Sequence, residues 1–144
     1  MATLNTSAVD AKPIKASSGV HMAMAFGSYT TVSGTTLADG DVINLVKVPK
    51  GARVVELKLS SGDCDSNGTP AVIFDVGDTD DADRYIDGST VGQTGGSLNS
   101  NAYDPYHAYT ADSYISVTVV TAPATQVNGA SIAIAVTYTM DEIF

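Results

Sequence analysis

Carboxylates form the densest group of chemically active side chains in the sequence. Six aspartates lie within 13 residues around Arg84, namely Asp75, Asp78, Asp80, Asp81, Asp83 and Asp87. Like charges at this spacing repel one another unless they are solvated, paired with a cationic group or bridged by a metal ion. A solvated acidic loop is the favoured interpretation. Salt bridges to a neighbouring subunit and a bound Ca²⁺ are the alternatives.

A second acidic segment has part of the pattern of a calcium loop. Asp63, Asp65, Asn67 and Gly68 match positions 1, 3, 5 and 6 of such a loop. The match fails at position 12, where Phe74 stands in place of the bidentate glutamate, and no helical pattern flanks the segment. Because Asn-Gly is a strong turn signal, a turn is favoured over a metal site. We therefore expect no cofactor, with Ca²⁺ as the alternative.

Nucleophilic and metal catalysis have little support in the sequence. Cys64 lies between Asp63 and Asp65, and these like charges disfavour the thiolate. The chain has one cysteine and two histidines, His21 and His107, which is too few for a zinc site or for a cupin-like metal enzyme. We expect that the protein is not an enzyme.

An aromatic run suggests a contact surface. Tyr103, Tyr106 and Tyr109 surround His107 and resemble a sugar-binding or contact loop, because tyrosine rings offer large amphipathic areas. Anchoring of this loop onto the fold is the favoured alternative. These residues give one hypothesis for the function of the chain, a carbohydrate-binding jelly-roll module, as in a phage head fibre or a lectin-like protein. It is the alternative to the hypothesis given at the end of this subsection.

The charges are unevenly distributed. A net charge of −9 argues against nucleic acid as a direct partner, and no apolar run approaches the roughly 20 residues that span a membrane. Four of the seven basic residues, Lys47, Lys50, Arg53 and Lys58, lie within 12 positions. A basic segment and a separate acidic loop could steer head-to-tail contacts between subunits or close within one molecule. Charge and position predict an interface made of Lys12, Lys15, Lys47, Lys50, Arg53, Asp80, Asp81, Asp83, Arg84 and Asp87.

These groups must be positioned by strands. Val, Ile and Thr number 16, 8 and 16, and such β-branched residues favour sheet. Alternating or continuous apolar runs predict six strands, over residues 20–26, 42–48, 52–59, 71–76, 113–121 and 130–139. One or two weaker strands are also expected, and a short segment at 84–86 could pair. The short turn at Pro49–Gly51 predicts that the second and third of these strands form an antiparallel hairpin. In the last two strands, Ile115, Val117 and Val119 share one face, and Ile132, Ile134, Val136 and Tyr138 face inward.

The order of these elements predicts an all-β fold, a two-sheet antiparallel sandwich of jelly-roll-like topology. Residues 1–19 have no apolar periodicity and are expected to form an extended N-terminal arm, either a loose tail or a strand that pairs with a neighbouring subunit. Residues 20–144 are expected to form a single domain. A long loop at about 77–112 is a candidate functional insertion.

The middle of the chain resembles the capsid decoration, or cement, proteins of tailed double-stranded DNA phages. The turn–strand–turn segment Ala38–Val55, with its Val-Pro-Lys-Gly-Ala turn, is similar to a hairpin of these small head proteins. Gly68–Gly77, which ends in Asp-Val-Gly, and Asp81–Gly88 are similar to the segments that follow it. A polar arm that leads into the Ala-rich strand Val20–Phe26 also fits.

The resemblance covers about residues 20–90 and implies a jelly-roll-like subunit, commonly a homotrimer. Such a subunit sits on the outside of an icosahedral head, assembled in the host cytoplasm, and bridges neighbouring major capsid proteins. The family has no catalytic residues to carry over. The expected partners are therefore the major capsid protein and further copies of the chain, with no nucleic acid and no membrane.

Overall fold

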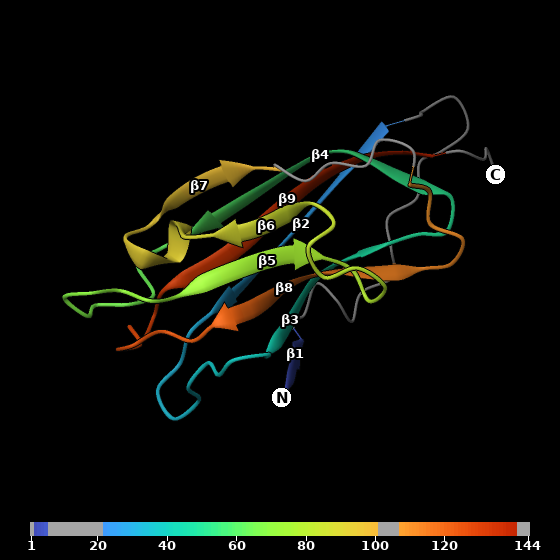
Figure 1. The fold of residues 1–144 in the computed structure, drawn as a ribbon. Helices are drawn as coiled ribbons and strands as arrows, with labels where there is room; N and C mark the ends of the chain where they lie inside the picture. Colours follow the sequence, from blue (N-terminus) through green and yellow to red (C-terminus); the bar gives the residue numbers. More distant parts are fainter. Residues whose placement is uncertain (1, 6–21, 101–106, 141–144) are drawn as a thin grey trace.

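Two β-sheets face each other in the computed structural model, which describes residues 2–5, 22–100 and 107–140 (Figure 1). The first sheet has the order β1 (Thr3–Asn5), β3 (Val42–Val48), β8 (Ser113–Thr121), β5 (Ile73–Gly77) and β6 (Ile86–Ser89). The second has the order β2 (Met22–Thr30), β9 (Ser131–Met140), β4 (Ala52–Ser61) and β7 (Gly96–Asn99). A short 3₁₀ helix, η1, covers Val91–Gln93. No helix in these described ranges is long and apolar enough to cross a membrane.

The chain passes repeatedly between the two sheets. β2, β4, β7 and β9 lie in one sheet, and β3, β5, β6 and β8 lie in the other. All strand pairs are antiparallel except β1 with β3. Two interleaved four-stranded sheets of this kind are the arrangement of a jelly roll, to which β1 adds a fifth strand. The predicted all-β sandwich is confirmed.

The hairpin predicted around Pro49–Gly51 is wrong. β3 pairs with β8, whereas β4 pairs with β9 and β7, so the turn carries the chain from one sheet to the other. Its backbone is held by a third segment, since the Gly51 amide donates to the Tyr109 carbonyl and the Tyr109 amide donates to the Ala52 carbonyl. Turn chemistry indicates where a chain reverses, but it does not indicate which strand becomes the neighbour.

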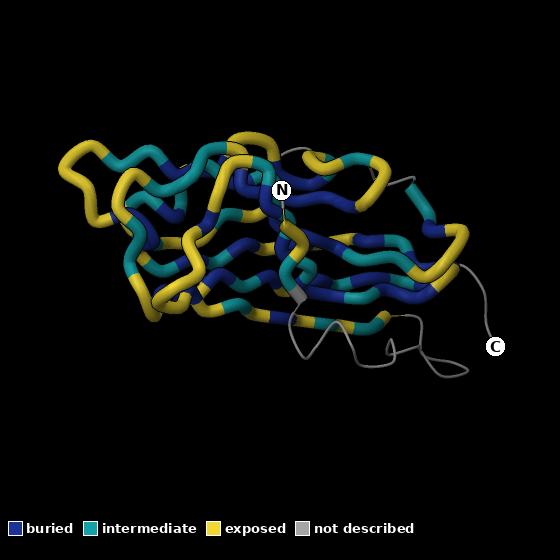
Figure 2. Tube along the Cα trace, turned by 90° about the horizontal axis from the view of Figure 1, so that it is seen from below, coloured by how far each residue is buried: buried dark blue, intermediate teal, exposed yellow. Residues whose placement is uncertain are grey.

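The core lies between the sheets, where the buried stretches face one another (Figure 2). Ile115, Val117 and Val119 of β8 are buried as predicted, and so are the four β9 residues predicted to face inward, Ile132, Ile134, Val136 and Tyr138. In β4 the pairing with β9 shifts between Val54 and Glu56. Because of this bulge Val54 is buried and Val55 is exposed, although strict alternation places Val55 with Leu57 and Leu59.

The first half of β2 directs its large side chains outward. Ala23 and Ala25 pack against the core, while Met22, Met24 and Phe26 are exposed. Further along, a Cβ atom at Gly27 would overlap the carbonyl oxygen of Leu45 in β3. Small residues therefore let this part of β2 approach the other sheet closely, and Gly27 leaves no room there for a larger side chain.

The predicted long loop at 77–112 contains regular structure. β6 pairs with β5 at one end of the first sheet, and β7 pairs with β4 at one end of the second. Between them η1 places Gly92 against Phe74, so closely that an added Cβ would lie 2.5 Å from a ring carbon. Short strands rich in glycine and polar residues carry too little alternation for a sequence pattern to show them.

The described part of the N-terminal arm pairs with its own chain. Residues 3–5 lie parallel to β3, the Ala2 amide donates to Oδ1 of Asp41, and the Val42 amide donates to the Ala2 carbonyl. Asp41 is buried, and its Oδ2 accepts the Ala38 amide. The rest of the predicted arm lies outside the described residues, as do Lys12 and Lys15.

Candidate functional site

A buried carboxylate organises the acidic loop. Asp78 follows directly after β5, and its side chain is 2% exposed. Its Oδ2 accepts hydrogen bonds from Nε of Arg84 at 2.7 Å and from the hydroxyl of Tyr109 at 2.8 Å. Its Oδ1 accepts the backbone amides of Asp80 and Asp81. Asp78 is thus an internal anchor of this loop rather than part of a solvated acidic surface.

Tyr109 connects Asp78 to the core. Its hydroxyl lies 2.7 Å from that of Tyr85, and both rings are buried. Burial, followed by the neighbouring Tyr85 and Asp78, raises the pKa of Tyr109 far above its ordinary value, so the phenol stays protonated and can donate to Asp78. His107 packs edge-on against the Tyr109 ring, and its Nε2 lies 3.9 Å from Oδ2 of Asp78.

The burial of Tyr109 is informative about the predicted aromatic contact loop. Tyr109 is 6% exposed and fits the anchoring alternative rather than an exposed platform for a sugar ring. Tyr103 and Tyr106 lie outside the described residues. The cavity beside the anchor, about 400 Å³, is lined by Asp80, His107 and Tyr114, among others.

Arg84 is occupied within the chain. Besides Asp78, its guanidinium lies 3.9 Å from Asp81. Burial lowers the pKa of Arg84, but Asp78 and Asp81 outweigh this effect and raise it. Because these contacts lie inside one subunit, they neutralise part of the acidic loop, and a contact of Arg84 with another subunit would have to replace or share them.

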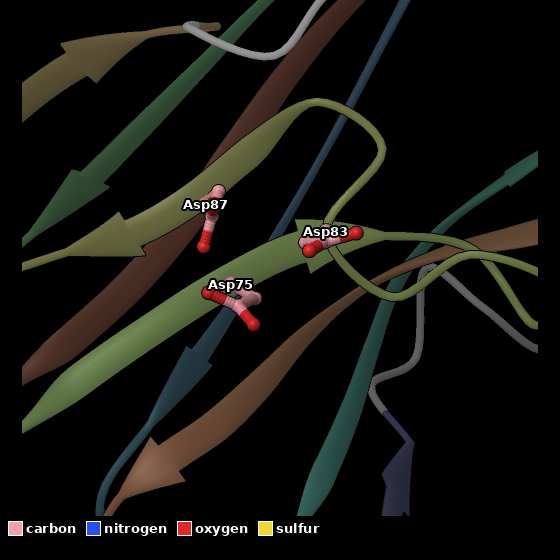
Figure 3. A group of neighbouring side chains, drawn as sticks. All are labelled: Asp75, Asp83 and Asp87. Carbon is pink, nitrogen blue, oxygen red and sulfur yellow. The ribbon is translucent and has the colours of Figure 1, made fainter.

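The remaining acids of the loop lie at the surface. Asp80, Asp83 and Asp87 are exposed and Asp81 is half-buried. A side-chain hydrogen bond with Asp83, together with burial, raises the pKa of Asp81. Three of the acids lie close together, namely Asp75 on β5, Asp83 in the loop and Asp87 on β6 (Figure 3). One carboxylate oxygen of each lies within 4.8 Å of one oxygen of each of the others. Three oxygens are half or fewer of the six to eight that Ca²⁺ takes, and exposed carboxylates group in this way without an ion.

The basic residues are divided between the two sheets. Lys47 lies on β3, with its Nζ 5.6 Å from the centre of the Tyr114 ring. Lys50 lies in the turn, and Arg53 and Lys58 lie on β4 in the other sheet. The expected compact basic hairpin is therefore absent from the described structure, because its two strands belong to different sheets.

The segment around Cys64 is a turn, as favoured. Side-chain oxygens of Asp63, Asp65 and Asn67 each accept the backbone amide two residues ahead, and Asp65 also accepts the amides of Ala71, Ala124 and Thr125. Burial opposes ionisation of Asp65, but these backbone amides together hold its pKa well below the ordinary value. Cys64 is buried, and burial raises the pKa of its thiol, which opposes a role as nucleophile.

Two features escaped the sequence analysis. The first is the burial of Asp78. The sequence offers six aspartates in this segment, and only the folded structure shows that Asp78 is buried while the other five are not. The exposed apolar face of β2 was visible as an alternation, but the alternation alone did not show which face is buried.

No protein-family model matches the chain, and no curated protein matches it. Solved structures do match. A chain in the capsid of Ralstonia phage GP4 is 22% identical, with a TM-score of 0.82 over 96% of this chain and 97% of that one. A chain in the capsid asymmetric unit of cyanophage Pam1 is 29% identical, with a TM-score of 0.75 over 83% and 84%.

A third match is a chain in the acid-stable capsid of Helicobacter pylori bacteriophage KHP30, which is 20% identical, with a TM-score of 0.62 over 87% of this chain and 94% of that one. All three structures are phage capsids, and two of them match this chain over nearly all of their own length. These matches support a phage capsid-type protein with a jelly-roll-like fold.

Proposed function

We propose that the chain is a structural virion protein that decorates a phage head. It binds the outer surface of the icosahedral capsid and stabilises contacts between major capsid proteins, as the resemblance to cement proteins implies. The observation that carries the proposal is the match to a chain of a phage capsid over 96% of this chain and 97% of the other.

The surface chemistry suits this role. A decoration protein is held by many weak contacts that add up through symmetry, and it needs no catalytic centre. The exposed carboxylates of Asp80 and Asp83 lie in the loop that Asp78 fixes from inside, and Asp87 follows on β6. Together they offer a preorganised acidic surface for a capsid partner. A chain with a net charge of −9 is also repelled by DNA.

The proposed assembly is a homotrimer that bridges several capsid subunits. Lys12 and Lys15 in the arm, Lys47, Lys50 and Arg53 on the sandwich, and the acidic surface of the loop are its proposed contact residues. The basic groups are distributed over both sheets, which suits contacts with more than one neighbour.

Binding to capsids tests the proposal directly. Shells of the encoding phage that lack this chain are mixed with the purified protein and sedimented, and the bound protein is quantified. We expect saturable binding and shells that resist heat better. Asp83→Asn should weaken binding several-fold, whereas Glu56→Gln, which removes an exposed acid from β4, should not.

The role in the virion is wrong if the wild-type chain does not sediment with shells and antibodies against it do not label intact virions. If Asp83→Asn and Glu56→Gln bind shells equally well, the acidic surface is not part of the interface, although the proposed decoration role is not contradicted. A double variant Lys12→Ala, Lys15→Ala tests the contribution of the arm in the same assay.

A further inference from the structure

β2 is the longest sheet edge in the described structure. The strands at the other three edges, β1, β6 and β7, have three, four and four residues, whereas β2 has nine. Among the described residues only β9 pairs with β2, so one side of its backbone has no strand partner there. Sheet edges are usually protected by short length, proline, charge or a bulge. β2 has no proline, no charged residue and no shift in its pairing.

The outer face of β2 is apolar. Met22, Met24 and Phe26 are 57%, 60% and 75% exposed, and they account for three of the six large exposed apolar side chains among the described residues. β9, its neighbour, also contains no charged residue. The chain carries 23 Lys, Arg, Asp and Glu residues, but the 19 residues of β2 and β9 include none, so the outward-facing ones form an uncharged surface.

The backbone of β2 is oriented to accept another strand at these same residues. The Thr31 amide donates to Ala130 and the Thr31 carbonyl accepts from Gly129, so the backbone groups of Thr31 face the β9 side. In an antiparallel strand the backbone amide and carbonyl groups of successive residues point to alternate sides of the strand. The β2–β9 register is regular from Met22 to Thr30, so this alternation is unbroken along β2. The amides and carbonyls of Met22, Met24 and Phe26 therefore face the free edge.

We propose that β2 pairs antiparallel with β2 of a second copy of this chain, about a two-fold axis at Met24. The segment Met-Ala-Met-Ala-Phe reads large–small–large–small–large in both directions. Such a pairing places Met24 opposite its own symmetry mate and Met22 opposite Phe26. It joins the two four-stranded sheets into one and gathers six large apolar side chains on one face.

A second copy is the occupant that the charges favour. Two chains that each carry −9 repel one another overall, and an uncharged surface is a place where that repulsion is small. β2 and β9 provide it, and the same surface on both copies is self-complementary in side-chain size and in hydrogen bonding. The inference does not rest on the proposed role in a capsid, since the contact concerns two copies of the chain alone.

Cysteine crosslinking tests the pairing and its register. In a Cys64→Ser background, Met24→Cys should form a two-subunit band on a non-reducing gel after mild oxidation, because opposite residues of paired strands lie about 5.5 Å apart between Cα atoms. Met22→Cys and Phe26→Cys should crosslink poorly alone and well when mixed. The matched control is Val120→Cys, an exposed apolar position on β8 of the other sheet.

Charge at the axis tests the energetics. Met24→Lys should abolish the two-subunit species in sedimentation equilibrium, since it places two like charges opposite each other. Val120→Lys should leave that species unchanged, and circular dichroism should show both variants folded. A contact along a two-fold axis cannot lie between the subunits of one three-fold trimer and would instead join two trimers. The gel shows a two-subunit band in either case, so it is read independently of the proposed trimer.

The proposal is overturned if Met24→Cys crosslinks no more than Val120→Cys, or if Met24→Lys has the same mass distribution as the wild type. Strong crosslinking of Phe26→Cys alone, with little at Met24→Cys, would overturn the register. Neither result depends on binding to shells, so failure here and failure of the decoration role are distinguishable.

Discussion

The hydroxyl group of Tyr109 donates a hydrogen bond to Oδ2 of Asp78 across 2.8 Å. At the same time the Tyr109 backbone is bonded to Gly51 and Ala52, in the turn that carries the chain between the sheets. One residue therefore joins the acidic loop to the crossover between β3 and β4. The two segments that sequence analysis treated as separate charged regions share this anchor.

Loss of the Asp78 carboxylate should destabilise the protein. Asp78→Ala leaves the buried Tyr109 hydroxyl and the Arg84 guanidinium without this acceptor, and breaking a buried pair of this kind costs roughly 3 kcal/mol. Urea denaturation of the variant measures the free energy of unfolding. Asp80→Ala, which removes an exposed carboxylate from the same loop, should change it by less than about 0.5 kcal/mol. Equal effects of the two substitutions would contradict the anchoring role.

Acid should weaken the turn around Asp65. Its pKa in the folded state lies below the ordinary value of 3.8, so its ionised form contributes stability that is present above about pH 4. That contribution is lost as the pH falls toward the folded-state pKa, with a slope of at most about 1.4 kcal/mol per pH unit for one proton. Thermal unfolding from pH 6 to pH 2 should show a smaller decline for Asp65→Asn than for the wild type.

The comparison with Asp63→Asn isolates this effect. Asp63 is exposed and accepts one backbone amide, whereas Asp65 is buried and accepts four. Asp63→Asn should therefore retain the acid dependence of the wild type. If the unfolding temperature of both variants falls with pH as steeply as that of the wild type, other carboxylates control the loss of stability in acid.

Cys64 should be unreactive in the native protein. Burial raises the pKa of the thiol and outweighs the opposite effect of a hydrogen bond with Ser61, and the nearby Asp63 and Asp65 raise it further. Ellman's reagent at pH 8 should label the chain at the rate of unfolding and label it fully in guanidinium chloride. Rapid labelling without denaturant would show that the thiol is accessible and would reopen a chemical role for it.

Gly27 should tolerate no side chain. A Cβ atom there would overlap the Leu45 carbonyl, so Gly27→Ala forces β2 away from β3 and should cost roughly 2 to 3 kcal/mol in the free energy of unfolding. Gly68→Ala is the matched control, because no heavy atom lies within 4 Å of its added Cβ. The control should be neutral or slightly stabilising. If the two variants have the same free energy of unfolding, the close contact between the sheets at Gly27 is not required for stability.

The strands with strong apolar alternation could be predicted from sequence because burial of one face is a local property. Ile132 and Val136 are buried where the pattern placed them. Pairing partners are not local, and the Pro49–Gly51 turn joins strands of different sheets. β7 was missed because glycine and serine leave no alternation in Gly96–Asn99.

The candidate site was predictable only in part. The cluster of aspartates was visible, but what distinguishes Asp78 from Asp80 is contact with Tyr109, a residue 31 positions away in the chain. Likewise β2 was predicted as a strand, yet its inward face is set by the close approach of Gly27 to Leu45. In both cases a long-range contact decides the role of a residue whose type and spacing are ambiguous.

The interleaving of the two sheets also constrains when the protein can fold. β9 lies between β2 and β4, and its partners on β2 are 101 to 117 positions distant, from Thr30 with Ser131 to Met22 with Thr139. A nascent chain therefore emerges from the ribosome with an uncharged apolar strand near its N-terminus that acquires its partner only after the last strand is synthesised. Such high contact order predicts slow folding, during which the apolar side chains and free edge of β2 are exposed to aggregation.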